Sequence, residues 1–408
     1  MDSERAPHVQ EEDIEGADRG TKKKRVNNET KKKRRSYIPK FGCFRIEYDA
    51  TGESFDMEVV DASGQRPKPT HLIITVNGLI GSAQNWKFAA KQFLKRYPDD
   101  AIVHCSECNS AMLTFDGVDV MGERLAEEVI SVIKRYPSVQ KISFIGHSLG
   151  GLVARYAIAK LYGKDMSMEF SQGNGNCESQ ISDQECHDRK YEGKIAGLEP
   201  INFITSATPH LGSRGHKQVP MFCGFYSLEK AVSHVAGFFG RTGKHLFLTD
   251  SKNGKPPLLL QMVRDSEDMK FMSALRSFKH RVAYANARYD QLVGWSTSSI
   301  RRRNELPKRQ HLSRHEKYPH IVNVETATST SVPEEVTTES KVSSGSGKLD
   351  MEEEMIRGLT SMSWDRIDVS FSGIRQRYLA HSTIQVKSYR FNSDGTDVVQ
   401  HMVDNFQL

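Results

Sequence analysis

The pentapeptide Gly-His-Ser-Leu-Gly at residues 146–150 is the sequence feature best suited to chemistry. It lies within residues 141–163, where an apolar run ends and an amphipathic segment begins, so we expect a turn between a buried strand and a helix. Glycines two positions before and after a serine allow the close backbone approach of a tight turn. The helix that follows would direct its amide groups toward a reacting carbonyl oxygen. Ser148 is therefore predicted to be a nucleophile, with a purely structural turn as the alternative.

A serine hydroxyl is a weak nucleophile at neutral pH, so it needs a base that takes its proton and an acid that orients the base. After a turn of this kind, the acid comes next along the chain and the base comes last. Asp290 directly follows residues 280–287, an apolar run predicted to be a strand. We predict Asp290 as the acid, with an ordinary turn aspartate as the alternative. Neither Asp250 nor Asp265 follows so clear a strand.

Five histidines follow the predicted acid and are candidates for the base. His381 lies one loop beyond the strand predicted at 366–371, where chain order places the last member of such a triad. His401 lies in a predicted amphipathic helix and is more simply a surface or packing residue. We therefore predict His381 as the base, with His401 as the weaker candidate. A strongly charged stretch that favours solvent exposure contains the other three: His311, His315 and His320.

The negative oxygen that forms when a carbonyl is attacked needs two backbone donors. The amide of Leu149, next after the serine, is one candidate. The other is the amide of Leu79, in a glycine-containing loop at residues 77–82 that follows a predicted strand. This loop could instead be a plain turn or cradle a phosphate, but it lacks the spacing of a phosphate-binding loop, which disfavours nucleotide binding.

The elements that must hold these residues alternate between strand and helix. Short apolar runs predict strands buried on both faces of a sheet, and longer amphipathic segments between them predict helices. Such alternation specifies a mostly parallel α/β sheet, preceded by two further strands at 37–48 and 55–62. The other expected strands are 71–78, 101–106, the start of 141–163, 201–207, 280–287 and 366–371, with helices at 86–97, 118–136 and the remainder of 141–163.

Several segments depart from this alternation. Residues 1–36 are charged and lack apolar periodicity, so we predict a disordered basic leader followed by a single domain at 37–408. Residues 164–193 and 326–348 are polar and are predicted to be flexible surface insertions. Residues 216–248 are rich in apolar side chains, which suits either a mobile cap over an apolar substrate or completion of the core.

The positive net charge comes from one short segment. The 408 residues include 57 Lys and Arg against 51 Asp and Glu, a net charge of +6. Nine of the basic residues lie within residues 22–35 beside one glutamate, which leaves 48 basic and 50 acidic side chains elsewhere. A nucleic-acid-binding face on the folded body is therefore disfavoured. The basic run could contact an anionic membrane, serve as a nuclear import signal or be a solvated tail.

Cysteine usage and the N-terminal sequence favour an intracellular protein. The six cysteines show no regular disulfide spacing. Cys105 and Cys108 have the spacing of a zinc or redox pair, but no second pair lies at ligand spacing, so we predict neither a metal nor another cofactor. Residues 1–16 are acidic and lack the apolar segment of a secretory signal, and no apolar run is long enough to span a bilayer. We expect a cytoplasmic or peripheral membrane protein, with the nucleus as an alternative location.

Seven segments, in order from about residue 70 to the C-terminus, carry a family resemblance: VNGLIGSAQNW, GERLAEEV, FIGHSLGGLVARYAI, SATPHLGSRG, GKHLFLTD, YANARYDQLVGWSTSSIR and AHSTIQVKS. They resemble the putative serine esterase family of α/β-hydrolases, which includes the yeast Rog-type lipases and their plant relatives. The resemblance implies an α/β-hydrolase fold and a hydrolase of carboxylic esters with lipid-like substrates. In it Ser148 matches the family nucleophile, Asp290 its acid and His381 its base. Asn77 departs from the family, many of whose members have a histidine before the glycine.

Three functions are compatible with these residues. The first is hydrolysis of a lipid ester, such as an acylglycerol or a phospholipid or lysophospholipid, through an acyl-enzyme. The second is a non-catalytic binding protein of the same fold that retains a lipid or another small ligand. The third is acyl transfer to an alcohol other than water, which uses the same residues. The presence of all three triad candidates favours catalysis, and their convergence in space would support it further.

Overall fold

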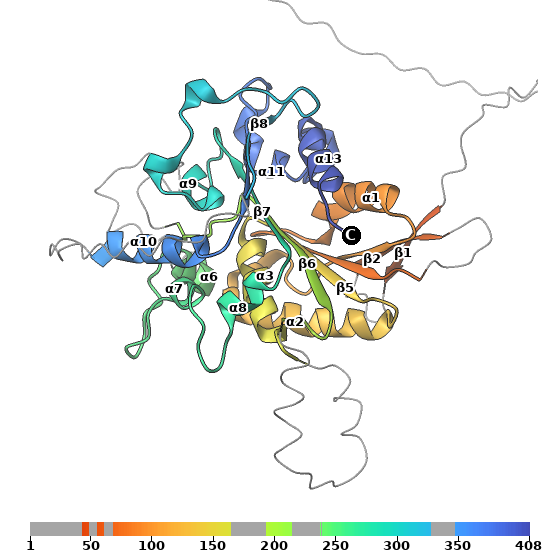
Figure 1. The fold of residues 1–408 in the computed structure, drawn as a ribbon, viewed down its shortest axis with the longest axis horizontal. Helices are drawn as coiled ribbons and strands as arrows, with labels where there is room; N and C mark the ends of the chain where they lie inside the picture. Colours follow the sequence, from red (N-terminus) through yellow and green to blue (C-terminus); the bar gives the residue numbers. More distant parts are fainter. Residues whose placement is uncertain are drawn as a thin grey trace, which may run out of the picture. The chain divides into compact units, whose positions relative to one another are not determined.

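Nine strands form one sheet in the part of the chain that the computed structural model describes (Figure 1). The described residues are 43–48, 55–60, 68–164, 193–213, 237, 239–327 and 347–408. Those from residue 43 onward belong to one compact unit, Gly42–Leu408. Residues 1–36, for which we predict a disordered leader, lie outside the described residues, as do nearly all residues of the insertions predicted at 164–193 and 326–348.

The strands lie in the order β1-β2-β4-β3-β5-β6-β7-β9-β8. Neighbours from β4 through β9 pair in parallel, whereas β1, β2 and β8 join the edges in antiparallel pairs. Parallel pairing places the carboxyl ends of these strands at one edge of the sheet. The strands are β1 (Cys43–Tyr48), β2 (Phe55–Val60), β3 (His71–Val76), β4 (Ala101–Cys105), β5 (Lys141–His147), β6 (Glu199–Ser206), β7 (His280–Asn286), β8 (Ile321–Glu325) and β9 (Asp365–Val369).

Helices cover both faces of the sheet. On one face α2, α3 and α8 pack together, and on the other α1 and α13 lie side by side (Figure 1). A mostly parallel sheet between two helical layers confirms the predicted α/β-hydrolase fold. The α-helices are α1 (Lys87–Arg96), α2 (Val118–Arg135), α3 (Leu149–Leu161), α6 (Gly240–Leu246), α7 (Leu258–Gln261), α8 (Phe271–Arg276), α9 (Trp295–Ser299), α10 (Gly347–Thr360), α11 (Ala380–Thr383), α12 (Tyr389–Asn392) and α13 (Thr396–Asp404). Short 3-10 helices are η1 (Ala83–Trp86), η2 (Ala111–Phe115), η6 (Arg303–Glu305), η7 (Arg309–His311), η8 (Arg377–Leu379) and η9 (Ser393–Gly395).

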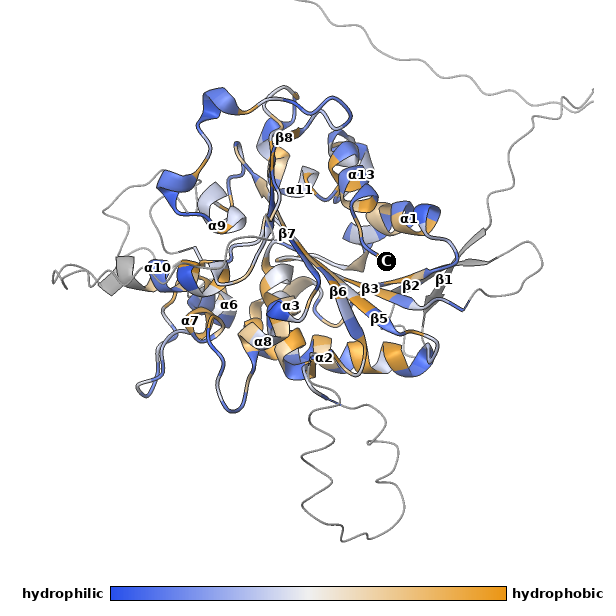
Figure 2. Ribbon diagram, viewed as in Figure 1, coloured by the Kyte–Doolittle hydropathy of each residue, from blue (hydrophilic) through white to orange (hydrophobic). Residues whose placement is uncertain are grey.

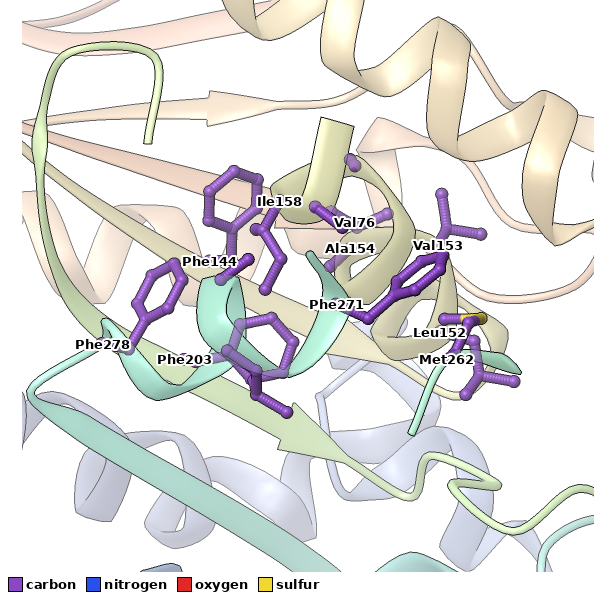
Figure 3. Close-up of a cluster of buried hydrophobic side chains, with 14 of the residues drawn as sticks. Val76, Phe144, Leu152, Val153, Ala154, Ile158, Phe203, Met262, Phe271 and Phe278 are labelled. Carbon is purple, nitrogen blue, oxygen red and sulfur yellow. The ribbon is translucent and has the colours of Figure 1, made fainter. Parts of the chain in front are cut away.

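The hydrophobic core extends over both faces of the central strands, where Figure 2 shows hydrophobic residues concentrated. Successive residues of β5 alternate between the faces: Phe144 joins the cluster that contains α2 and α3, and Ile145 joins the cluster that contains α1 and α13. Phe278 packs edge-on against Phe144 and Phe203, with ring centroids 6.1 and 5.5 Å apart (Figure 3). Such edge-to-face pairs add to the stabilisation from burial.

Most predicted elements are present, with ends within two residues of the expected positions, as for β7 and α2. The first strand begins later than predicted, at Cys43. Strand β8 was not predicted from the sequence, because it is short and exposed at its C-terminal end and so shows no clear periodicity. None of the described helices is both long and apolar enough to cross a membrane.

A buried charged cluster joins β2 and α2 to β4. His104 on β4 is fully buried; its Nδ1 contacts Asp56 of β2, and its Nε2 lies 3.2 Å from Glu128 Oε1 of α2. Burial by itself would lower the pKa of His104, but the two carboxylates outweigh burial and raise the pKa to about 9. Burial would likewise raise the pKa of Glu128, but His104 and other hydrogen-bond donors lower it to about 2. The cluster is therefore an imidazolium between two carboxylates.

We predict that this imidazolium makes stability fall as the pH rises. A raised pKa in the folded state stabilises the protein fully below the ordinary value of 6.5, and this contribution is lost as the pH rises through about 9. The contribution is about 3 kcal/mol in the free energy of unfolding. Urea denaturation between pH 6 and 10 should show that His104→Gln is less stable than the parent at neutral pH and loses less stability as the pH rises.

His71→Gln is the matched control for this measurement. His71 is also buried, but burial lowers its pKa to about 3, so its titration affects stability only on the acid side of pH 6.5. The control should keep the parent's dependence on alkaline pH. A parent-like dependence in His104→Gln would show that His104 is not charged in the folded protein.

Candidate active site

Ser148 lies at the carboxyl end of β5, on a strained turn that leads directly into α3. Its backbone has φ of 54° and ψ of −127°, which is unfavourable for a residue with a Cβ atom. A hydrogen bond of 2.8 Å from the Ser148 amide to the carbonyl of Ser206 ties the turn to β6. The conformation raises the hydroxyl above the sheet edge, as expected for a nucleophile on a strand-to-helix turn.

Two glycines are required for this turn because neighbouring backbone passes very close to them. A Cβ atom at Gly150 would lie 2.3 Å from the carbonyl oxygen of Val76, at the end of β3. At Gly146 it would lie 2.6 Å from the Cα atom of Gly151. Both distances are shorter than side chains tolerate, so packing against the end of β3 requires the glycine at 150 and packing against the start of α3 requires the glycine at 146.

The structure brings Ser148, His381 and Asp290 into one hydrogen-bonded chain. Nε2 of His381 lies 3.0 Å from Ser148 Oγ, and Nδ1 lies 3.0 Å from Asp290 Oδ2. An ionised carboxylate only accepts hydrogen bonds, so Nδ1 carries the proton and Nε2 is free to accept one from the serine hydroxyl. This is the arrangement of nucleophile, base and acid in a serine hydrolase.

The loop after β7 holds Asp290 as a carboxylate. Its Oδ1 accepts hydrogen bonds of 2.9 Å from the amides of Leu292 and Val293, and its Oδ2 accepts one of 2.9 Å from Asn286 Nδ2. Burial by itself would raise the pKa of Asp290, but His381 and these donors outweigh burial and hold the pKa below its ordinary value. The carboxylate is therefore charged and fixed in orientation before any ligand binds.

His147 forms a hydrogen bond with the backbone of His381, a contact that the sequence pattern did not predict. The side chain is buried, and its Nε2 lies 2.7 Å from the backbone carbonyl oxygen of His381, so Nε2 donates this hydrogen bond. Burial, together with the nearby His381 ring, holds the pKa of His147 well below its ordinary value, which keeps His147 neutral. The signal in the sequence is the residue directly before Ser148, which is a histidine and can therefore form hydrogen bonds.

The weaker base candidate lies elsewhere. His401 on α13 is buried, and its Nδ1 forms a 2.8 Å hydrogen bond with the hydroxyl of Tyr284. Burial lowers the pKa of His401 to about 4. Of the three histidines expected to be solvent-exposed, His320 is instead partly buried and bonded to Asp397 (2.9 Å), whereas the other two are exposed.

The two predicted oxyanion donors lie on opposite sides of the serine in sequence. Leu149 is the first residue of α3, and Leu79 follows Gly78, at which a Cβ atom would lie only 2.8 Å from the Cβ atom of Ser148. Within the described part of the chain, neither the Leu79 nor the Leu149 amide has an acceptor. Both amides are therefore available to a ligand beside the nucleophile.

A second layer of hydrogen bonds supports the loop that carries Leu79. The Ile80 amide donates to Thr114 Oγ1 of η2 (3.0 Å), and Thr242 Oγ1 of α6 donates to the Thr114 carbonyl (2.8 Å). Asn77, the residue that departs from the family pattern, donates through Nδ2 to the carbonyl of Asn109 at 3.0 Å. This contact shows what the asparagine side chain does there: it ties the loop to the segment after β4.

The segment predicted as a cap or as core, residues 216–248, is described only at residue 237 and from residue 239 on. Phe239 stacks on Phe115 of η2 with ring centroids 6.0 Å apart, and Thr242 is fully buried. The described part is thus packed into the body. The rest of the segment lies outside the described residues, so a cap there stays a prediction.

The family segment GKHLFLTD and the cysteine pair contribute no residue to the hydrogen-bonded chain of Ser148, His381 and Asp290. The segment contributes Lys244, His245 and Asp250 to a cavity of about 660 Å³ that no triad residue lines. Cys105 is fully buried, and burial raises the pKa of its thiol to about 12, so it is not a ready thiolate. No group of three or more potential metal ligands occurs among the described residues.

We predict that His147 sets the reactivity of Ser148 through the position of His381. His147→Phe removes the hydrogen bond to the His381 carbonyl, and the rate of Ser148 labelling by a fluorophosphonate should fall about 10- to 100-fold. His147→Gln keeps an N–H donor and should recover part of this rate, which a purely space-filling role would not explain. His401→Gln, at another buried histidine, should leave the rate unchanged. Equal labelling rates in His147→Phe and the parent would contradict the positioning role.

Comparisons with known proteins place this chain among serine esterases. Residues 66–300 match the family described as "Putative serine esterase (DUF676)", a range that includes Ser148 and Asp290 and ends before His381. The chain is 30% identical over 272 residues to a Saccharomyces cerevisiae protein named "Putative lipase ROG1", which covers 65% of this chain and 33% of that protein. A Schizosaccharomyces pombe protein also named a putative lipase is 27% identical over 191 residues, covering 46% of this chain and 20% of that protein. The chain thus matches a third or less of the length of these relatives.

Solved structures show a more distant likeness. An α/β-hydrolase superfamily protein from Enterococcus faecalis aligns with a TM-score of 0.37 and 13% identity, covering 63% of this chain and 84% of that one. An esterase from Pyrococcus furiosus aligns with a TM-score of 0.33 and 14% identity, covering 64% of this chain and 77% of that one. The family match spans more than half of the sequence, and the chain belongs to the putative serine esterase family.

Proposed function

We propose that this protein is a serine hydrolase of carboxylic esters that works through an acyl-enzyme. The observation that carries the proposal is the hydrogen-bonded chain from Ser148 through His381 to Asp290, with 3.0 Å at each step. Asp290 is buried and charged, so it holds the Nδ1 proton of His381 and leaves Nε2 as the acceptor for the serine proton. Membership of the serine esterase family supports the same reaction.

In the proposed reaction Ser148 Oγ attacks the ester carbonyl carbon while its proton passes to Nε2 of His381. The carbonyl oxygen becomes negatively charged and accepts hydrogen bonds from the amides of Leu79 and Leu149. The intermediate collapses when His381 returns the proton to the leaving alcohol, and an acyl-serine remains. A water molecule then gives a proton to Nε2 of His381 and attacks the acyl carbon. His381 returns this proton to Ser148 Oγ as the bond between Oγ and the acyl carbon breaks, which releases the carboxylic acid and restores the serine.

The proposed substrates are lipid esters, either acylglycerols or phospholipids and lysophospholipids. The two loops that carry Leu79 and Asp290 also expose apolar side chains, Ile80 at 58% and Leu292 at 46%. Apolar surface beside the nucleophile suits an acyl chain. Two of the yeast relatives are named putative lipases, which supports the same class.

We predict that the proposed triad controls both labelling and turnover. Ser148→Ala should abolish labelling by a fluorophosphonate probe, and His381→Ala should lower kcat on a short p-nitrophenyl ester by about four to six orders of magnitude. His401→Ala is the matched control, because His401 is a buried histidine bonded to Tyr284, and it should retain activity. Loss of activity in His401→Ala with activity kept in His381→Ala would overturn the assignment of the base.

The same labelling experiment distinguishes a hydrolase from a non-catalytic binding protein of this fold. A binding protein would hold a lipid without reacting, so its serine would not be labelled in a manner that depends on His381. Assays with monoacylglycerols, lysophospholipids and short esters would then identify the preferred substrate class. Transfer of the acyl group to an added alcohol would show up as a new ester product in place of free acid.

A further inference from the structure

The exposed apolar side chains of this protein are concentrated around the candidate active site. Ten large apolar side chains are exposed among the described residues, and only Val324 and Leu408 lie outside this group. The other eight form what we call the apolar rim: Ile80, Met112, Leu113, Leu292, Tyr378, Leu379, Tyr389 and Phe391. Single exposed apolar residues need no explanation, but a group of this size around one site does.

The topology of the sheet explains why these residues come together. Ile80 follows β3, and η2, which carries Met112, follows β4; the loops with Leu292 and Tyr378 follow β7 and β9. These four strands are parallel, so the loops after them lie at the same edge of the sheet. Two hydrogen bonds agree with this placement. The Ile80 amide donates to Thr114 of η2, the element that carries Met112, and the Leu292 amide donates to Asp290 of the proposed triad.

The part of the rim nearest the proposed base is also positively charged. Residues 371–393 contain four basic side chains and no acidic one. Arg377 lies over the rings of Tyr289 and Tyr378, at 5.3 and 5.2 Å, and Arg390 lies 5.4 Å from the ring of Phe391. The four basic residues are Arg375, Arg377, Lys387 and Arg390. None of them forms an ion pair with any residue that the structure describes.

Apolar and aromatic side chains mixed with unpaired cations suit one kind of partner. At a bilayer surface, aromatic rings insert at the level of the headgroups, and arginine and lysine contact anionic headgroups while their aliphatic stems stay in apolar surroundings. Tyr389, which is 60% exposed, also stacks on Phe88 of α1 at 5.3 Å, so part of the rim is held by the body of the protein. Pre-positioned contacts of this kind reduce the entropy lost on binding.

We propose that the apolar rim and the four cations of residues 371–393 form a docking surface for an anionic lipid bilayer. Docking through this edge would place Ser148 and His381 against the bilayer, where an ester is presented at the headgroup level. This inference rests on the proposed function, because docking would serve to bring lipid esters to Ser148. Binding to the bilayer itself requires no catalysis. The inference also differs from the expectation that residues 22–35 contact membranes, because it assigns the contact to the folded body.

The experiment measures binding of the Ser148→Ala protein, with its full sequence, to sedimenting vesicles. One set of vesicles contains phosphatidylcholine alone and the other contains phosphatidylcholine with phosphatidylserine. We expect binding to the anionic vesicles that weakens with added salt. Tyr389→Ser with Phe391→Ser, and separately Arg375→Gln with Arg390→Gln, should each lower the affinity about tenfold or more.

Matched controls use residues away from the rim. Val324→Ser removes an exposed apolar side chain of β8, and Lys68→Gln with Lys141→Gln removes two cations at the amino ends of β3 and β5, the opposite edge of the sheet. These variants should bind as tightly as the parent. The basic run at 22–35 is unchanged in every protein, so any binding that it contributes is common to all.

Two outcomes would overturn the inference. One is failure of the parent to bind anionic vesicles. The other is binding of the rim variants as tight as that of the controls, which would mean that another part of the chain makes the contact or that the rim accepts a protein partner. With Ser148 restored, hydrolysis of a soluble short ester should be equal in rim and control variants, which verifies that the rim variants are folded. Vesicle binding without such hydrolysis would count against the proposed function alone, and hydrolysis without vesicle binding would count against this inference alone.

Discussion

The left-handed turn at Ser148 is the constraint on which the candidate site depends. A side chain in this backbone conformation costs about 1 to 3 kcal/mol, and the surrounding sheet must supply that energy. The turn can form only because β5 is central, with β3 and β6 paired on either side and Ser206 bonded to the Ser148 amide. The same close packing against Gly150 brings the end of β3 to the nucleophile. The loop that carries Leu79 follows this end of β3, so the packing of β3 against the turn places this loop beside Ser148.

Burial does not by itself decide which histidines are charged. His104 is fully buried and charged, because two carboxylates contact its ring. His147 and His401 are neutral because burial lowers the pKa of each ring, and their hydrogen-bond partners, a carbonyl and a tyrosine hydroxyl, do not outweigh burial as the two carboxylates do at His104. At the candidate site, Asp290 is a buried carboxylate that faces His381. A neutral His147 can fix the position of His381 without competing for the carboxylate.

The sequence allowed the fold to be predicted, and it singled out the three residues that the structure joins in one hydrogen-bonded chain, because both depend on local patterns and on chain order. Apolar runs mark the central strands, and the serine turn is defined by glycines within three residues of it. The supports of the site were not predictable in this way. His147 and His381 are separated by 234 positions, and Thr114 meets Thr242 from 128 positions away, so these contacts appear only when the sheet has been assembled. Strand β8 was missed for a different reason, its short length and exposed end.

The order of the triad along the chain has a consequence for folding. His381 lies 233 residues beyond Ser148 and 91 beyond Asp290, so assembling the candidate site requires contacts of very large sequence separation. Such contacts form late, because the entropy of a long loop must be lost before they are gained. During synthesis the strained serine can therefore be in place on β5 while the loop that carries His381 is still being made. Under the proposed mechanism, Ser148 therefore gains its base only after β9, the strand that precedes His381, has joined the sheet.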